Sequence, residues 1–147
     1  MAGITQGMCD SFKVQILSGQ QNLVAGGATY KIALYTSTAT LSNSTTAWTA
    51  SNEVTGGSSS NYTAGGNTLT VSTSPTSTGN VAFMSFANSS WTNANITANG
   101  ALIYNATTTA NTAVAVLAFG GDKTATNGTF TVIFPTADST NAIIRIA

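Results

Sequence analysis

Apolar residues recur about every four positions near the start of the chain, and this spacing predicts one amphipathic helix. The apolar positions are Met8, Cys9, Phe12, Ile16 and Leu17. Thr5 is a suitable N-cap, and Gly19 stands where a C′ glycine would end the helix. We therefore predict a helix over residues 6–18, within an N-terminal segment spanning residues 5–19.

Two roles fit this helix, and the sequence leaves both open. Its apolar stripe can pack on the domain's own sheet, or the helix can dock on a neighbouring subunit as an arm. In the second case Met8, Phe12 and Ile16 are the residues expected to contact the partner.

Apolar and polar residues alternate in much of the remaining chain, which predicts β-strands. Residues 29–36 place Tyr30, Ile32 and Leu34 on one face. Residues 68–73 alternate leucine and valine with hydroxyl residues, which indicates a half-buried strand with a solvated outer face.

Two segments, 81–87 and 112–119, are apolar on both faces, which predicts central strands or strands at a subunit interface. Asn-Gly pairs at 99–100 and 127–128 precede two further strands, and this dipeptide favours type I′ hairpin turns. The final residues, 142–147, are expected to form one more strand.

Long polar stretches at 37–46 and 55–67 predict loops, the second flexible unless a partner orders it. Roughly seven to nine short strands, with turn signals every 8–12 residues, are typical of a sandwich or barrel. No internal repeat or break in composition divides the chain. We predict a single domain over residues 1–147: all-β, a mainly antiparallel sandwich or barrel, with one short N-terminal helix.

Charge is nearly absent from this chain. Charged residues make up 5% of it, against roughly 25% in an ordinary soluble domain. The polar surface must therefore consist of Thr, Ser, Asn and Gln, and a net charge of zero removes most of the repulsion that keeps domains apart. This composition suits a protein that works assembled on a partner. Four scattered cations form no patch for nucleic acid.

The side chains needed for catalysis are scarce. The chain has no histidine and one cysteine, which excludes histidine-dependent nucleophilic devices and zinc sites built on histidine or several cysteines. The carboxylates Asp10, Glu53, Asp122 and Asp138 show no spacing typical of a glycosidase pair. We expect no enzymatic activity, no cofactor and no metal, and we expect Cys9 to be a small buried apolar residue.

Residues 120–124 (GGDKT) are similar to a phosphate-binding loop, but aspartate stands where that loop needs glycine. This segment therefore predicts a turn between two strands. The N-terminus lacks the features of a signal peptide, and no apolar run approaches the length of a membrane span, so we expect a protein made in the cytosol without a membrane partner.

Four aromatic residues admit two interpretations. Trp48, Trp91, Tyr62 and Tyr104 can stack on sugar rings, which would indicate a glycan-binding module. Aromatic residues in strands more often lie in the core or at subunit contacts. Trp48 and Trp91 therefore join the candidate partner-contact residues.

A series of short segments, in order along the chain, carries a resemblance that composition alone does not. The segments are 30–36 (YKIALYT), 37–41 (STATL), 49–54 (TASNEV), 62–66 (YTAGG), 99–105 (NGALIYN), 113–119 (AVAVLAF) followed by 120–123 (GGDK), and 134–138 (FPTAD). Taken together they cover most of the chain and resemble a family of small virion proteins of tailed bacteriophages, often encoded beside capsid genes.

The resemblance implies a capsid decoration (cement) protein on the exterior of the virion, which binds the shell of the major capsid protein and stabilises the head. Cement proteins are small, β-rich and commonly trimeric, so it also implies a homotrimer. The nearest alternative is a tail or head-fibre component that acts as a receptor- or glycan-binding module. The family has no catalytic motif, so no residue role carries over.

Overall fold

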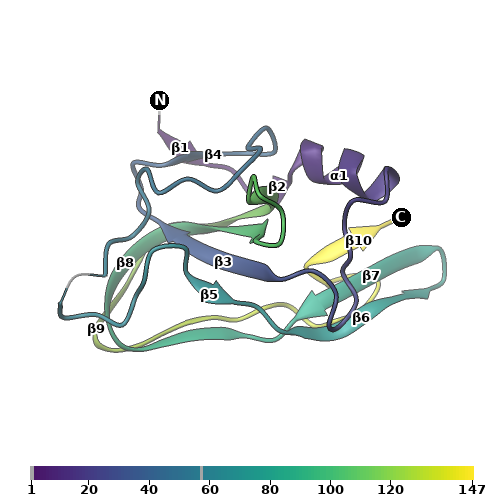
Figure 1. Cartoon of the computed structure of the whole chain (residues 1–147). Coiled ribbons are helices and arrows are strands. Elements are labelled where there is room, and N and C mark those ends of the chain that lie inside the picture. Colours follow the sequence, from purple (N-terminus) through teal and green to yellow (C-terminus); the bar gives the residue numbers. More distant parts are fainter. Residues whose placement is uncertain (1, 57) are drawn as a thin grey trace.

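The computed structural model describes residues 2–56 and 58–147. These residues form one α-helix and ten strands, which assemble into three sheets (Figure 1). Strand pairs in this part of the chain are antiparallel except for the short pair of β1 (Gly3–Ile4) and β4 (Thr40–Leu41). Of these two strands, β4 lies within the loop predicted over residues 37–46. The prediction of an all-β, mainly antiparallel fold with one short helix is confirmed.

The largest sheet has five strands and holds most of the core. Its strands, in spatial order, are β2 (Gly7–Met8), β9 (Thr112–Val132), β8 (Ser89–Asn105), β3 (Tyr30–Tyr35) and β5 (Asn67–Thr68). At its centre Ile32 of β3 lies opposite Ile103 of β8, and both side chains are fully buried. The second face of β3 is covered as well, because Ala33 and Tyr35 are also buried.

The second sheet has three strands, in the order β10 (Ile144–Ile146), β7 (Val81–Phe86) and β6 (Val71–Thr78). The central position predicted for residues 81–87 is confirmed in β7, and that of 112–119 in β9, which lies between β8 and β2. The chain itself buries residues 83–86 and 113–117 on both faces. Neither strand therefore needs a second subunit to cover it.

The strand predicted over residues 68–73 is two strands in two sheets. Thr68 ends β5, which pairs with β3, and Val71 begins β6, which pairs with β7. Leu69 is buried between them. The alternating pattern marks extended backbone correctly, but it does not show that the chain passes from one sheet to the next.

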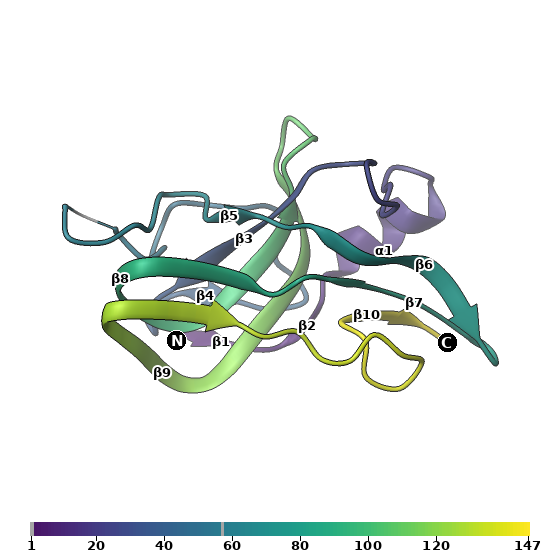
Figure 2. The ribbon, with the colours of Figure 1, turned by 90° about the horizontal axis from the view of Figure 1, so that it is seen from below.

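β8 and β9 form a long ribbon that curls on itself, and Figure 2 shows β9 turning back through a wide bend. Ala98 pairs with Lys123 and Gly100 with Ala118, so Asn99 alone lies opposite residues 119–122. Gly120 and Gly121 have positive φ angles of 74° and 143°, which suit glycine. The turn predicted at Gly120–Asp122 is therefore a bulge inside one strand.

The hairpin turns predicted at both Asn-Gly pairs are wrong. Gly100 lies inside β8, where an added Cβ would be 2.5 Å from the Leu117 carbonyl oxygen, so close packing explains this glycine. Asn127 has a φ of 48° inside β9, and Gly128 pairs with Ala94 at a register shift. A left-handed Asn there makes an irregularity in the strand and does not reverse the chain.

Helix α1 (Asp10–Leu17) is shorter than predicted, because residues 6–9 are not helical and Cys9, not Thr5, is the N-cap. Gly7 and Met8 form β2 and pair with Val116 and Ala115 of β9. Glycine is a poor helix former, and the edge of β9 offers its backbone a ladder of hydrogen bonds, so strand pairing prevails.

The C-terminal end of α1 is confirmed. Gly19 has a φ of 73° and its N–H donates to the Ile16 carbonyl at 3.1 Å. The N–H of Gln20 donates to the Gln15 carbonyl at 2.8 Å. These two bonds make a Schellman motif, with glycine in the left-handed position that the motif requires.

Candidate interaction surface

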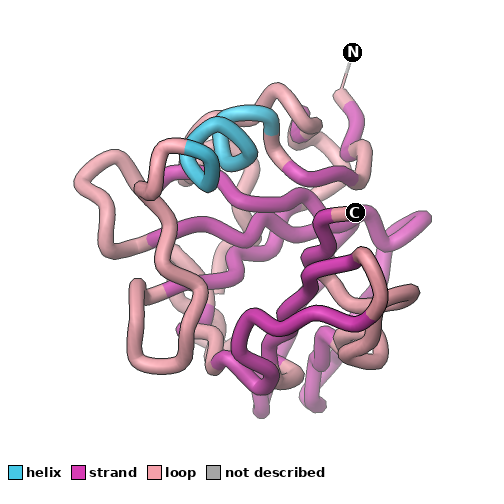
Figure 3. The backbone as a smooth tube through the Cα atoms, turned by 90° about the vertical axis from the view of Figure 1, so that its right-hand side faces the viewer, coloured by secondary structure: helices cyan, strands magenta, loops and turns pink. Residues whose placement is uncertain are grey.

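Large apolar side chains are exposed mainly at one end of the molecule. The exposed fractions are 89% for Leu17, 64% for Val14, 46% for Val24, 48% for Ile146 and 74% for Ile133. All but Ile133 belong to α1, to the segment that follows it, or to β10. Figure 3 views this end and shows α1 above the strands, with the C-terminal end of the chain facing the viewer. Clustered apolar exposure of this kind marks interaction sites.

A groove of about 280 Å³ lies between α1 and β10. Its lining residues are Met8, Lys13, Ile16, Leu17, Arg145 and Ile146. Ile146 also lines a smaller groove over β7, together with Leu23, Ala82 and Ile144. We call the residues that line these two grooves the α1–β10 surface.

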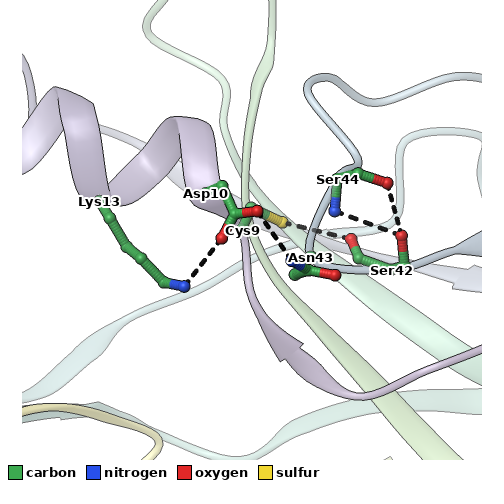
Figure 4. Close-up of polar contacts among 6 residues, drawn as sticks. All are labelled: Cys9, Asp10, Lys13, Ser42, Asn43 and Ser44. Atoms are coloured by element: carbon green, nitrogen blue, oxygen red, sulfur yellow. Dashed lines mark hydrogen bonds and ion pairs between the residues drawn. The ribbon is translucent and has the colours of Figure 1, made fainter.

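The N-terminal end of α1 is held against the loop after β4 (Figure 4). The Asp10 N–H donates to the Asn43 carbonyl at 2.8 Å, and the Asn43 side-chain amide donates to Asp10 Oδ2 at 2.7 Å. Lys13 Nζ donates to Asp10 Oδ1 at 2.8 Å, and this hydrogen bond lowers the pKa of the Asp10 carboxyl group. An acidic residue in the first turn also complements the helix dipole.

Cys9 lies directly beneath this anchor, with its Sγ 4.0 Å from the Ser42 carbonyl oxygen (Figure 4). The residue is fully buried, and burial raises the pKa of its thiol to about 11. A neutral, buried thiol is a poor nucleophile. Cys9 therefore serves as a small apolar residue under the start of α1.

Arg145 is the second cation of the groove, and it lies near enough to Asp138 for its charge to help lower the pKa of that carboxyl group. Its Nη1 donates to the Ser139 carbonyl at 3.2 Å, while Lys13 is paired with Asp10. Within the described residues no carboxylate lies within ion-pair distance of Arg145. The guanidinium therefore has free donors at the edge of an apolar groove.

The structure brings together two of the five predicted contact residues. Met8 and Ile16 both line the groove. Trp48 is half-buried, and its ring stacks on Tyr104 with centroids 5.8 Å apart. The sequence does not identify Arg145 and Ile146, because nothing in its periodicity places the end of the chain beside the helix.

Phe12 and Trp91 are corrections to the predicted contact set. Their exposed fractions are 0% and 3%, so neither side chain has surface to offer a partner. Phe12 is in the hydrophobic core, and Trp91 packs between Tyr62 and Phe130 with ring centroids 5.7 and 6.2 Å away.

The apolar spacing includes Leu17 in the stripe of the helix, but Leu17 does not pack on the sheet and is the most exposed of the large apolar residues. In an α-helix it lies about 140° around the axis from Phe12. That angle places Leu17 away from the core, and the helical period alone could have identified it.

A buried polar cluster fastens the segment after Glu53 to β3. Glu53 Oε1 accepts hydrogen bonds from the Tyr62 hydroxyl and from the Gly65 N–H, both at 2.6 Å. The Tyr62 oxygen accepts from the Leu34 N–H at 2.9 Å, and the Tyr104 hydroxyl donates to the Gly65 carbonyl at 2.8 Å. These groups bind one another, so the cluster is a structural support. The rings of Tyr62 and Tyr104 are core residues and present no face to a sugar.

A third groove, of about 430 Å³, lies where β9 bends back on itself. Residues on both sides of the bend line it, among them Phe119, Phe130, Lys123 and Thr129. The two phenylalanine rings lie 6.2 Å apart. The groove combines an apolar floor with hydroxyl groups and one cation, which is the usual character of a small-molecule site.

In the part of the chain that the structure describes, no three His, Cys, Asp or Glu side chains gather to hold a metal ion. No helix in that part has the length and apolar character needed to cross a membrane. Comparison of the chain with protein-family models, with curated proteins and with solved structures yields no match.

Proposed function

We propose that this chain is a structural protein of a bacteriophage virion, and that it decorates the capsid by binding the outer face of the major capsid protein shell. The single observation that carries the proposal is the α1–β10 surface, an apolar face on a domain with almost no charge. Such a face suits a permanent place in an assembly. The choice of a virion as that assembly rests on the resemblance of the short segments described above.

The chemistry of the surface favours stable binding to a protein shell over catalysis of a reaction. Short Thr, Ser and Asn side chains form hydrogen bonds with little loss of conformational entropy, and salt screens such bonds less than ion pairs. Many copies on one shell hold neighbouring capsomers together through linked, individually modest contacts. The role is stabilisation of the head, without catalysis and without a cofactor.

The resemblance also favours a homotrimer, the common state of cement proteins at threefold positions. A trimer would bury part of the exposed apolar surface of each subunit. We expect size-exclusion chromatography with light scattering to give about three times the chain mass. A stable monomer at micromolar concentration would count against the trimer and leave the decoration role standing.

Copy number on purified particles tests the decoration role. A decoration protein occurs in hundreds of copies per particle by quantitative gel analysis, and particles that lack it release their DNA at a lower temperature. Re-addition of the purified chain to such particles should restore their heat resistance. A few copies per particle, or unchanged heat resistance without the chain, would refute the role.

The groove at the bend of β9 favours one second candidate, a receptor- or glycan-binding module of the tail or head fibre. Phe119 and Phe130 provide an apolar floor for a sugar ring, and Lys123 can bind an acidic substituent. Binding on a glycan array that Lys123→Ala abolishes, without loss of folding, would favour this function. Absence of binding on the array would remove it.

A further inference from the structure

β10 is an open sheet edge. It pairs on one side with β7, where Ile144 lies opposite Met84 and Ile146 opposite Ala82. No strand of the described residues pairs with its other side. An edge of this kind leaves backbone N–H and C=O groups available to another chain.

The other edges of the two main sheets are less suited to accept a strand. β6, at the far edge of the same sheet, carries Pro75 and two register shifts, both of which block regular pairing. β2 and β5, at the edges of the five-stranded sheet, are two residues long each, one residue shorter than β10. β10 has neither proline nor bulge among the residues described.

The groove between α1 and β10 reaches two residues of this strand, Arg145 and Ile146. Arg145 and Ile146 are successive residues of a strand, so their side chains point to opposite faces. A groove that both of them line therefore lies at the edge of the strand, with α1 as its opposite wall. An extended chain laid along β10 would have Met8, Ile16 and Leu17 beside it.

The charged side chains of the groove indicate which side chains a bound segment should carry. Asp10 forms an ion pair with Lys13, whereas Arg145 forms no ion pair among the described residues and interacts with Asp138 only at longer range. A partner that covers this groove desolvates the guanidinium, which is unfavourable unless a carboxylate meets it. The complementary segment therefore carries one acidic side chain next to an apolar one.

We propose that an extended segment of a partner protein adds as a strand to the free edge of β10, places an apolar side chain between Ile16 and Leu17, and presents a carboxylate to Arg145. This is strand addition, in which backbone hydrogen bonds give affinity and side-chain pockets give specificity. The inference rests on the proposed function for the identity of the partner, which in a virion is the major capsid protein.

Selection of short random peptides displayed against the whole immobilised chain tests the proposal without knowledge of the partner. We expect the enriched peptides to alternate apolar and polar residues and to contain Asp or Glu. Synthetic copies should shift the amide resonances of Ile144 and Ile146. A copy N-methylated at the pairing residue should lose binding, because it lacks the N–H that bonds to β10.

Two variants and one control assign the contacts. Leu17→Ser and Arg145→Gln should each weaken peptide binding by about tenfold, equivalent to about 1.4 kcal/mol. Val14→Ser is the matched control, because Val14 is exposed on the same helix but does not line the groove. Both targeted side chains are exposed, so the variants should fold normally. Enriched peptides that lack acidic residues, or that bind both variants as tightly as the parent, would overturn the proposal.

Particle binding separates this inference from the proposed function. Attachment of Leu17→Ser and Arg145→Gln to capsids as tightly as the parent would leave the decoration role intact and refute the β10 site. Peptide binding that depends on both residues, by a chain that does not bind capsids, would support the β10 site and refute the decoration role.

Discussion

At the scale of single residues, the Glu53 carboxylate shows how a buried charge supports an irregular segment. Glu53 is 6% exposed, and one of its oxygens accepts bonds from both Tyr62 and Gly65. The Tyr62 hydroxyl also accepts from the Leu34 N–H of β3. One phenol therefore links the carboxylate to β3, a buried strand of the five-stranded sheet, and its removal leaves two buried groups short of a bond.

Replacement of Tyr62 tests this linkage. Tyr62→Phe should lower the free energy of unfolding by roughly 1–3 kcal/mol, because it leaves the Leu34 N–H unsatisfied in the core. Tyr30→Phe is the matched control, since its hydroxyl donates to the half-buried Gln21 and has no carboxylate partner. Denaturant unfolding of both variants measures the difference. Equal losses of unfolding free energy in the two variants would show that the Glu53 cluster contributes no more to stability than the bond between Tyr30 and Gln21.

Asp138 makes the free energy of unfolding depend on pH in the acidic range. Hydrogen bonds from the Asn141 side chain and from the Thr140 and Asn141 N–H groups lower the pKa of its carboxyl group. A lowered pKa in the folded state gives stabilisation that is present above the unfolded value of about 3.9 and is lost as the pH falls below it.

Asp138→Asn should therefore destabilise the chain at pH 6, and the difference from the parent should shrink below pH about 4. Thermal unfolding across this range measures both. Asp122→Asn serves as a comparison, because Asp122 is exposed and accepts a single side-chain bond, from Asn99. A deficit of Asp138→Asn that persists unchanged in acid would contradict this assignment.

At the scale of elements, sequence periodicity identifies what is extended and what is central, but not how the extended pieces connect. The two-faced apolar segments are central strands, and Gly19 ends the helix as expected. The Asn-Gly pairs mislead, because their left-handed preference serves a bulge as well as a turn. Helix α1 begins later than its apolar spacing predicts, because Gly7 and Met8 pair with β9 as a strand.

The residues of the candidate surface also fall into two groups, those that sequence periodicity predicts and those that it does not. Met8 and Ile16 follow from the period of the helix, whereas Arg145 and Ile146 depend on the strand order that brings β10 beside α1. Strand order arises from packing of the whole chain and leaves no local signal. Sequence reasoning therefore recovers one wall of the groove and misses the other.

Gly100 provides a test at this scale. Gly100→Ala places a methyl group 2.5 Å from the Leu117 carbonyl oxygen and 2.8 Å from Ile4 Cγ2, so the backbone must shift. We expect a loss of roughly 1–3 kcal/mol in the free energy of unfolding. Gly128→Ala is the control, because its nearest contact is an ordinary 3.6 Å. Similar stability of the two variants would show that β8 and β9 accommodate the added methyl group.

At the scale of the whole molecule, the four tyrosines are all buried, although the surface around them is polar. Burial raises the pKa of Tyr30 and Tyr104 to about 12, and it also raises the pKa of Tyr35 and Tyr62. A raised pKa in the folded state gives stabilisation that is full below the unfolded value of about 10 and is lost at higher pH.

An alkaline titration followed by tyrosinate absorbance should therefore show almost no ionisation of the native chain near pH about 10.5, where the denatured chain is largely ionised. The free energy of unfolding should begin to fall from pH about 10. Ionisation of one or more tyrosines in the native chain with an ordinary midpoint would place that ring in solvent.

The α1–β10 surface joins the two ends of the chain, and this sets when it comes into being. β8 and β9 are consecutive strands that pair along their length, so they can assemble early. Gly7 of β2 pairs with Val116, more than a hundred positions later, and β10 pairs with β7, so we expect both closures to follow the pairing of β8 with β9. A polypeptide that lacks residues 144–146 would lack one wall of the groove. The groove is therefore present only in molecules in which β10 has paired with β7.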